Sequence, residues 1–348
     1  MSTIRRRLLA VGIGIGLAAV VGLNVFVVPR VFGAEQPDPA SVAAAAAVAD
    51  LPALATALAA APAVRWSGTF ESADGAAWAL DARVTTAGTT LGTIKSATAI
   101  GEILAIGDRV FVRAADGFWG GMGITDARRT GFADRWVDVP QEFLGLDLAG
   151  AVGPAGITAP VAGAPTTVDG VAVQTVTAGE RTFQIRTTEP KGLVSVTAPG
   201  YRVTPAVLDD TERAAFFTQL RKAAAELPTA AGLGSLITQK GRAVLQACDS
   251  GSCTAKVAFT NRVAPTAKHV TTGDKVWATI VLTRNGKTAK ICPVSLTLAP
   301  GASKAATCAA EVQARNGATW RATTTPATAL SEAEAKTITE ALEAELPA

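Results

Sequence analysis

The stretch Val64-Arg65-Trp66-Ser67-Gly68-Thr69-Phe70 predicts the first strand of a β-rich domain in this 348-residue chain. Its large apolar side chains fall at every second position, which is the period of a strand with one buried face. Residues 78–84 repeat this alternation. Residues 103–106 and 109–113 flank Gly107-Asp108, which predicts a tight hairpin. The middle of the chain is therefore predicted to consist of short strands joined by turns.

The second half of this domain is predicted to end in a helix. Asp209 and Glu212 have the spacing of a capping box, and Pro228 stops the helix. The apolar stripe of the helix consists of Phe216, Leu220, Ala223 and Leu227. Further strands are predicted at residues 172–177, 181–187 and 192–197, and Phe118-Trp119 and Trp136-Val137 close the first group of strands.

The N-terminus predicts a membrane anchor. Leu8–Val28 is an uncharged run of 21 residues, roughly 31 Å long as a helix, which matches the hydrocarbon core of a bilayer. The preceding arginines, residues 5–7, favour a single-pass topology with a cytoplasmic N-terminus and the remaining chain outside. The alternative is a cleaved signal that ends at Val31-Phe32-Gly33, which would give a secreted protein.

An alanine-rich segment follows the anchor and predicts a helix from Ala40 to Ala61. Leu51, Leu54 and Leu58 recur at helical spacing and give this helix one apolar face.

The last third of the chain is predicted to be all β. Asn285-Gly286 lies between residues 276–283 and 288–294, which is a strong hairpin signal. Short strands at this spacing, together with disulfides, favour an immunoglobulin-like sandwich. Ser331 and Glu334 predict the start of a final acidic helix. The pattern leaves open whether this helix packs on the sandwich or is a solvated tail.

The four cysteines all lie in that last third. An even number in an exported segment predicts disulfides, and four cysteines allow three pairings. We favour Cys248–Cys253 and Cys292–Cys308. A zinc site is the less favoured alternative, because neither pair has CxxC spacing and His269 is not placed as a ligand partner.

The composition limits the chemistry that the chain can perform. The net charge is +3, and part of this excess comes from the N-terminal arginines, so no basic patch for nucleic acid is expected. His269 is the only histidine, and no GxSxG motif is present. The cluster of Asp209, Asp210 and Glu212 is explained by helix capping. We therefore expect a protein that is not an enzyme and needs neither a cofactor nor a metal.

A series of short phrases between residues 51 and 227 resembles the LppX/LprG-type lipid-carrier family of actinobacterial envelopes, which has a LolA-like fold. The order of these phrases carries the resemblance more than any one of them. They are Val64-Arg65-Trp66-Ser67-Gly68, Gly92-Thr93-Ile94, residues 102–113, Phe118-Trp119, residues 135–140 and Thr167-Val168-Asp169-Gly170-Val171. Characterised members carry a lipobox cysteine, which this chain lacks before Cys248.

The resemblance implies an antiparallel half-barrel with helices packed against its concave face and an apolar cavity for acyl chains between them. Such a cavity needs apolar walls with few polar groups. The candidate lining residues are Trp66, Phe70, Trp78, Leu80, Val84, Ile103, Ile106 and Phe111. The competing interpretation is that these side chains are ordinary core, because alternation does not show what fills the apolar face.

The sequence thus predicts an α+β protein with an N-terminal transmembrane helix, a LolA-like antiparallel half-barrel packed with helices, and an immunoglobulin-like sandwich with a C-terminal helix. Its expected role is to bind the acyl chains of a lipid or lipoprotein at the outer side of the membrane. The alternative is an envelope sensor or scaffold that uses the same domains for contacts with a protein partner. The predicted divisions are residues 1–33 (cytoplasmic stub and anchor), 34–50 (juxtamembrane), 51–228 (LolA-like), 229–240 (linker), 241–328 (sandwich) and 329–348 (helix).

Overall fold

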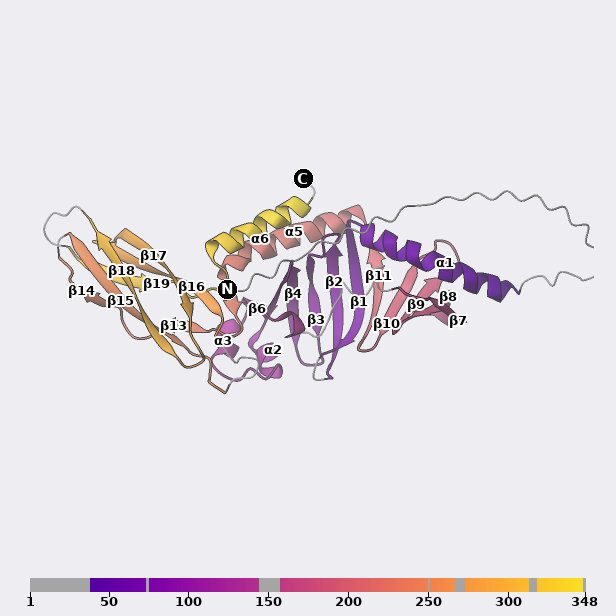
Figure 1. Cartoon of the computed structure of the whole chain (residues 1–348), viewed down its shortest axis with the longest axis horizontal. Helices are drawn as coiled ribbons and strands as arrows, with labels where there is room; N and C mark the ends of the chain where they lie inside the picture. Colours follow the sequence, from indigo (N-terminus) through magenta and orange to yellow (C-terminus); the bar gives the residue numbers. More distant parts are fainter. Residues whose placement is uncertain are drawn as a thin grey trace, which may run out of the picture. The chain divides into compact units, whose positions relative to one another are not determined.

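The computed structural model describes residues 38–72, 75–143, 157–249, 251–266, 273–312 and 318–346. Pro39–Ala348 form one compact unit. This unit consists mainly of antiparallel strands with several helices, which confirms the predicted α+β class (Figure 1). The predicted transmembrane run Leu8–Val28 and the single histidine, His269, lie outside the described residues.

A twelve-stranded sheet, called here the large sheet, dominates the first two thirds of the chain. Its strand order is β12-β6-β5-β4-β3-β2-β1-β11-β10-β9-β8-β7, and β1 pairs with β11 to join the two halves of the sequence. Neighbouring strands are antiparallel, except that β12 runs parallel to β6. The strands are β1 (Ala63–Glu71), β2 (Ala77–Thr85), β3 (Thr90–Lys95), β4 (Ile100–Ile106), β5 (Arg109–Ala114), β6 (Trp136–Val139), β7 (Val161–Val168), β8 (Val171–Ala178), β9 (Arg181–Arg186), β10 (Leu193–Ala198), β11 (Tyr201–Val207) and β12 (Ala231–Gly232).

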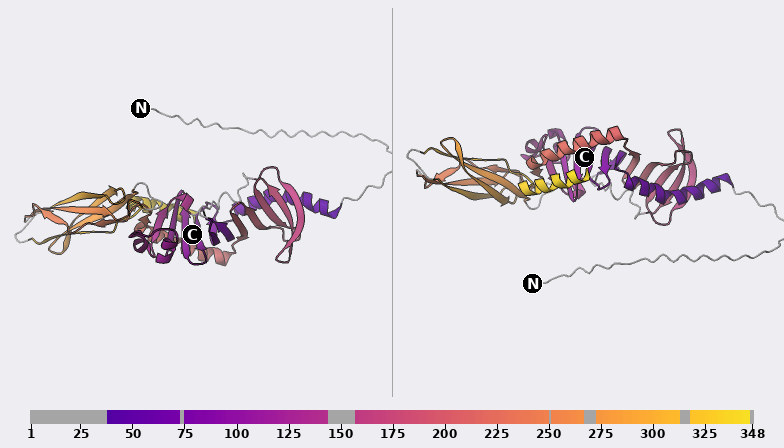
Figure 2. Two further views of the ribbon diagram at one scale, coloured as in Figure 1. Left: turned by 90° about the horizontal axis from the view of Figure 1, so that it is seen from below. Right: turned by 90° about the horizontal axis from the view of Figure 1, so that it is seen from above.

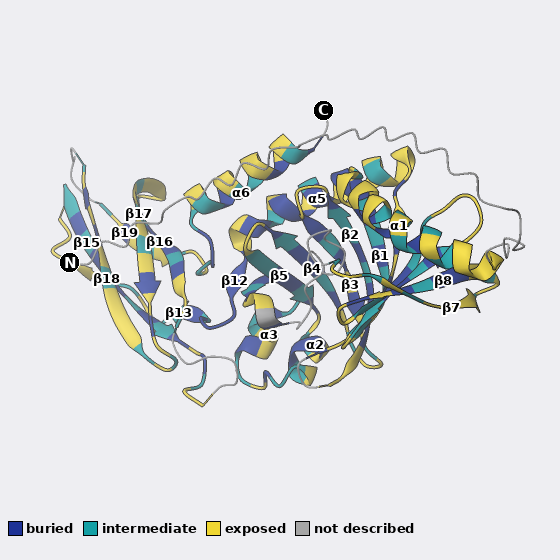
Figure 3. Ribbon diagram, turned by 45° about the vertical axis from the view of Figure 1, so that its right-hand side comes forward, coloured by how far each residue is buried: buried dark blue, intermediate teal, exposed yellow. Residues whose placement is uncertain are grey.

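The large sheet buries a separate apolar core on each of its faces, as the alternation of burial along its strands shows (Figure 3). What we call the first face carries Trp66, Leu80 and Ile94 and packs against α1 (Pro39–Ala60), α2 (Asp116–Gly121) and α3 (Arg128–Phe132). The second face carries Leu104 and Phe111 and packs against α5 (Asp210–Glu226) and α6 (Glu332–Glu345). Residues on opposite faces alternate because side chains of a strand point to either side in turn.

Helix α1 is, within the described ranges, the one helix long and apolar enough to cross a membrane. By length and composition it fits a single-pass anchor only weakly, because its Ala47 and Leu51 belong to the apolar core of the first face. It begins at Pro39, so the predicted division at residue 51 falls inside the helix. Most of its residues are exposed or half-buried.

The caps of α5 and α6 form as predicted, each as a complete capping box at Asp209–Glu212 and Ser331–Glu334. Helix α6 does not pack on the sandwich and is not a solvated tail. It lies along α5, and its Leu342 and Leu346 join the core of the second face (Figures 1 and 2). An ion pair between Arg221 and Glu343, 3.3 Å long, links the two helices. The physical reason is that α5 alone leaves part of its apolar stripe uncovered.

Two smaller sheets pack face to face around one apolar core and form a sandwich, as predicted. The Asn285-Gly286 turn joins β16 to β17, and both residues have positive φ, as a two-residue hairpin turn of type I′ requires. One sheet contains β13 (Ile237–Gln239), β14 (Val244–Gln246), β15 (Ser252–Asn261) and β18 (Ser303–Glu311), and the other contains β16 (Lys275–Arg284), β17 (Lys287–Thr297) and β19 (Trp320–Thr324).

Both predicted disulfides are confirmed. Cys292 on β17 bonds to Cys308 on β18, so this bridge joins the two sheets of the sandwich. Cys248 bonds to Cys253 across the turn that enters β15. With all four cysteines in disulfides, no cysteine thiolate is left as a zinc ligand.

One local prediction was wrong. Phe118-Trp119 does not belong to a strand but to the short helix α2, and both side chains are buried on the first face. Two adjacent aromatic residues do not alternate with polar ones, so they carry no strand pattern. The helix that contains them begins at Asp116.

Candidate functional site

The eight predicted lining residues separate onto the two faces of the large sheet. Six of them lie together on the first face: Trp66, Phe70, Trp78, Leu80, Val84 and Ile103. Ile106 and Phe111 lie on the second face, beneath α5 and α6. The strand period explains the separation, because Ile103 and Ile106 are an odd number of residues apart on β4. Only the group of six can line one common cavity.

The group of six is packed against other side chains. Phe70 stacks on Trp78 with ring centroids 6.5 Å apart, and Trp78 meets the edge of Phe118 at 5.6 Å. Trp119 continues this row toward Phe132 at 5.4 Å. Trp119 is fully buried, and its indole N–H donates to the Ala114 carbonyl. In this conformation the first face is therefore a closed aromatic core. Phe118, Trp119 and Phe132 are the members that alternation along the strands does not reveal, because they lie on helices.

A cluster of charged side chains gathers where β5, β6 and α6 meet. Arg109 donates to Asp138 at 2.9 Å and reaches Glu334 at 3.4 Å. Burial raises the pKa of Asp138 to about 6, because it outweighs the attraction of Arg109, and the nearby carboxylates of Asp274, Asp108 and Glu334 push in the same direction. Arg109 thus links α6, through Glu334, to β6, through Asp138.

A second charged pair connects the large-sheet domain to the sandwich. Arg128 is almost fully buried and donates to Asp126 at 2.9 Å and to the Leu233 carbonyl at 3.2 Å. Asp126 also accepts from the Ala264 N–H on the sandwich side, at 3.4 Å. Burial pushes the pKa of Asp126 upward, but the hydrogen bonds from Arg128 leave it below its usual value. The pair therefore stays ionised and serves as a structural link.

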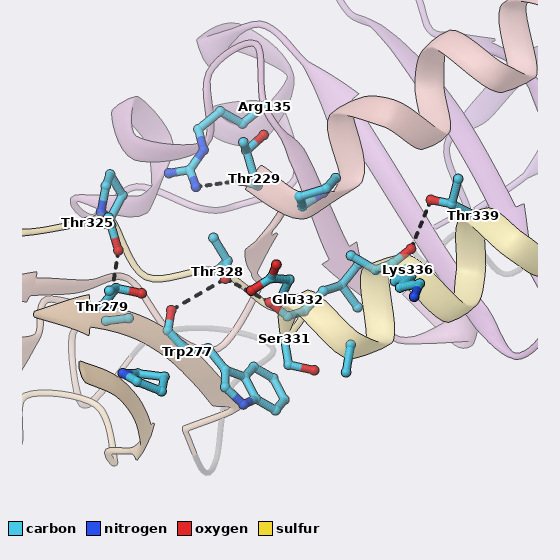
Figure 4. A pocket seen from close by; sticks show the side chains of 17 residues that line it. Arg135, Thr229, Trp277, Thr279, Thr325, Thr328, Ser331, Glu332, Lys336 and Thr339 are labelled. Carbon is cyan, nitrogen blue, oxygen red and sulfur yellow. Dashed lines mark hydrogen bonds between the residues drawn. The ribbon is translucent and has the colours of Figure 1, made fainter. Parts of the chain in front are cut away.

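An open space lies between these two domains, and we call it the junction groove (Figure 4). Its volume is about 1270 Å³, and its walls are mostly apolar. Trp277 on β16 and Leu330 before α6 form part of these walls. Arg135, just before β6, lies on the side of the groove opposite Trp277. A volume of this size exceeds most drug-sized pockets and suits an elongated ligand.

The sequence did not predict the junction groove. Arg135, Thr229, Trp277 and Ser331 come from four separate segments, and only the folded chain brings them together. In the described part of the chain, no group of three or more His, Cys, Asp or Glu side chains is placed to hold a metal ion.

Comparison of the chain with protein-family models and with curated proteins finds no match. The arguments for function therefore rest on the two apolar sites, the first face of the large sheet and the junction groove.

Proposed function

We propose that this chain is a membrane-anchored protein of the extracytoplasmic side that binds the acyl chains of a lipid or lipoprotein without catalysing a reaction. In this proposal residues 8–28 are the anchor, the large sheet is a LolA-like half-barrel, and the C-terminal sandwich is an immunoglobulin-like domain for contacts. The observation that carries the proposal is the continuous apolar layer formed by six predicted lining residues on the first face.

Two glycines are consistent with a large sheet that is strongly curved and has the first face on its concave side. A Cβ atom on Gly92 would lie 2.5 Å from the Cα of Ala82, and one on Gly68 would lie 2.0 Å from the Arg202 carbonyl oxygen. Both positions face the first core, since Gly68 pairs with Leu80 and Gly92 pairs with Ile103. Glycine at such positions allows neighbouring strands to bend inward, as in a barrel corner.

Helix α1 covers the part of the first face that β7 and β8 form, which continues the apolar core of the six lining residues. Only Ala47, Leu51 and Ala55 are buried on its 22 residues. One ion pair, between Asp50 and Lys191, fastens it to the loop before β10. Val48, Leu54 and Leu58 pack partly buried against the same core, so an acyl chain that replaced α1 would cover the apolar area that these side chains now cover.

The proposal is tested by native mass spectrometry with lipid extraction on residues 35–348, purified without detergent from an oxidising compartment. A stoichiometric lipid adduct is expected. Replacing Val84 with glutamate should abolish it, because Val84 is a half-buried side chain against the first core. The matched control is Leu91→Glu, a half-buried residue of the neighbouring strand β3 against the second core, which should keep the adduct.

A second candidate function is an envelope sensor or scaffold that binds a protein partner. The observation that favours it is the aromatic packing of the first face, which fills the space between sheet and helices in this conformation. A clean ligand-free mass, with no lipid uptake on titration, would contradict lipid binding and support this candidate. Loss of the adduct in both glutamate variants would also contradict a site confined to the first face.

A further inference from the structure

The hydroxyl groups around the junction groove are already used by the protein itself. Thr328 donates to the Leu330 carbonyl at 2.8 Å, Thr339 to the Ala335 carbonyl at 2.9 Å, and Thr229 to the Glu226 carbonyl at 2.8 Å. The Thr325 hydroxyl accepts from the Thr279 N–H at 3.0 Å. These groups therefore offer few free hydrogen bonds to a ligand. Such walls would leave backbone N–H and C=O groups of an extended peptide without hydrogen-bond partners, whereas a hydrocarbon chain needs none.

Arg135 is the charged group that lies between the groove and its smaller extension. It lines the junction groove and also an adjoining hollow of about 260 Å³ between the large-sheet domain and β13. Its guanidinium donates to the Thr229 carbonyl at 2.8 Å and to the Gly131 carbonyl at 3.5 Å. No carboxylate of the described residues forms an ion pair with it. Burial accordingly lowers the pKa of Arg135, since no negative charge compensates the lost hydration.

Among the described cations that line the groove, Arg135 is the one without an ion pair to a carboxylate. Lys336 lines the groove but pairs with Glu340 at 3.6 Å, and Glu332 is a carboxylate at the groove edge. The charge of Lys336 is thus compensated by Glu340, Glu332 is exposed, and Arg135 is the most buried of the three charged side chains that line the groove. A ligand with a single negative charge complements Arg135, because a guanidinium matches a carboxylate with two parallel hydrogen bonds.

We propose that the junction groove binds a single-chain fatty acid, with its carboxylate on Arg135 and its hydrocarbon chain along the wall formed by Trp277, Leu330 and Ala335. Trp277 lies on β16 across the groove from Arg135, so it provides an apolar surface at a distance from the head group (Figure 4). This site is separate from the first face of the large sheet and does not depend on lipid binding there.

The test is titration of residues 35–348 with oleate and with oleyl alcohol, below the micelle concentration, followed by tryptophan fluorescence and calorimetry. Arg135→Gln should weaken oleate binding about tenfold or more and leave the alcohol unchanged, because only the charge contact is lost. Arg202→Gln is the matched control, since Arg202 is an exposed arginine on β11. Thr339→Trp, which fills the groove, should weaken both ligands.

Three results would overturn the proposal. The first is the absence of saturable oleate binding, and the second is equal oleate affinity of the Arg135→Gln and Arg202→Gln variants. The third is tighter binding of oleoyl lysophosphatidate than of oleate, which would show that the site prefers a phosphate over a single carboxylate. Loss of oleate in Val84→Glu with retention in Arg135→Gln would place the ligand on the first face instead, so the two lipid sites are distinguished.

Discussion

Asp138 is the residue at which a single proton should change the stability of the molecule. Its pKa in the folded chain is about 6, raised mainly by burial from the ordinary value of 3.8. The folded state therefore binds this proton more tightly than the unfolded state does. The contribution of Asp138 to stability is fully present below about pH 4 and is lost as the pH rises through 6.

We expect Asp138→Asn to remove this pH dependence. Between pH 4 and pH 7 the free energy of unfolding of the wild type should fall by at most about 3 kcal/mol, at about 1.4 kcal/mol per pKa unit. The variant should lack this fall. Urea unfolding at several pH values measures this difference. Parallel curves for the two proteins would show that Asp138 titrates normally.

Asp81 provides a control of opposite sign. A hydrogen bond from Arg65 lowers the pKa of Asp81, and the positive charge of Arg65 lowers it further. Together these two effects outweigh burial, which raises the pKa. Stability from Asp81 is therefore present above about pH 4 and is lost on further acidification. Asp81→Asn should flatten only the acidic end of the wild-type curve.

The period of a strand alone predicts on which face of the sheet some of the lining residues lie. Ile103 and Ile106 stand three apart in one strand, so opposite faces follow from the strand period alone. The same holds for Phe111, which pairs with Leu104 across the hairpin and therefore shares its face. The sequence therefore sufficed to place Ile106 and Phe111 on the opposite face from the other six residues. Whether the remaining six meet side chains or ligand depends on α2 and α3, whose docking no local pattern encodes.

At the scale of elements, α6 should contribute measurably to the stability of the large-sheet domain. Leu342 is fully buried in the core of the second face, although it lies six residues from the C-terminus. Leu342→Ala should lower the free energy of unfolding by about 2–5 kcal/mol, as for other buried leucines. Urea unfolding followed by circular dichroism measures the change.

The control for this variant lies on the same helix. Thr337 is exposed on α6, so Thr337→Ala should change the free energy of unfolding by no more than about 0.5 kcal/mol. A small effect of Leu342→Ala, equal to that of the control, would mean that α6 is detached in solution.

Helix starts were predictable because their signals are local. The capping boxes at Asp209 and Ser331 involve residues three apart, and both form as expected. The docking of α6 was not predictable, since a helical stripe identifies the buried face of a helix but not the element that covers it. The same reason explains α2, whose aromatic residues are fixed by packing on the first face rather than by a pattern of their own.

At the scale of the whole molecule, the disulfides could be predicted from the sequence and the junction groove could not. The disulfides were predictable because pairing of near neighbours needs only spacing and an oxidising compartment. The groove was not, because Arg135 and Trp277 are far apart in the chain and meet only when the two domains are joined. A link that joins them, the hydrogen bond from the Ala264 N–H to Asp126, likewise connects distant positions.

The state of the cysteines in the cell tests the proposed topology of the whole chain. If residues 1–33 direct the chain across the membrane, all four cysteines reach an oxidising compartment and form the two disulfides. Full-length protein, extracted from cells with acid to prevent exchange, should then not react with a maleimide polymer until it is reduced. After reduction it should gain four additions in a gel-shift assay, one for each cysteine.

A chain that begins at residue 34 and stays in the cytoplasm is the control, and it should react at all four cysteines before reduction because cytoplasmic thiols are kept reduced. If the full-length chain reacts as readily as this control, its C-terminal domains lie in the cytoplasm. The anchor would then have the opposite orientation, and the proposal of an extracytoplasmic lipid-binding protein would fail. If the full-length chain is protected but leaves the membrane fraction in carbonate buffer, residues 8–28 have been cleaved or do not span the bilayer. Protection together with membrane retention is the expected result, since it requires both an oxidising environment for the sandwich and an intact anchor.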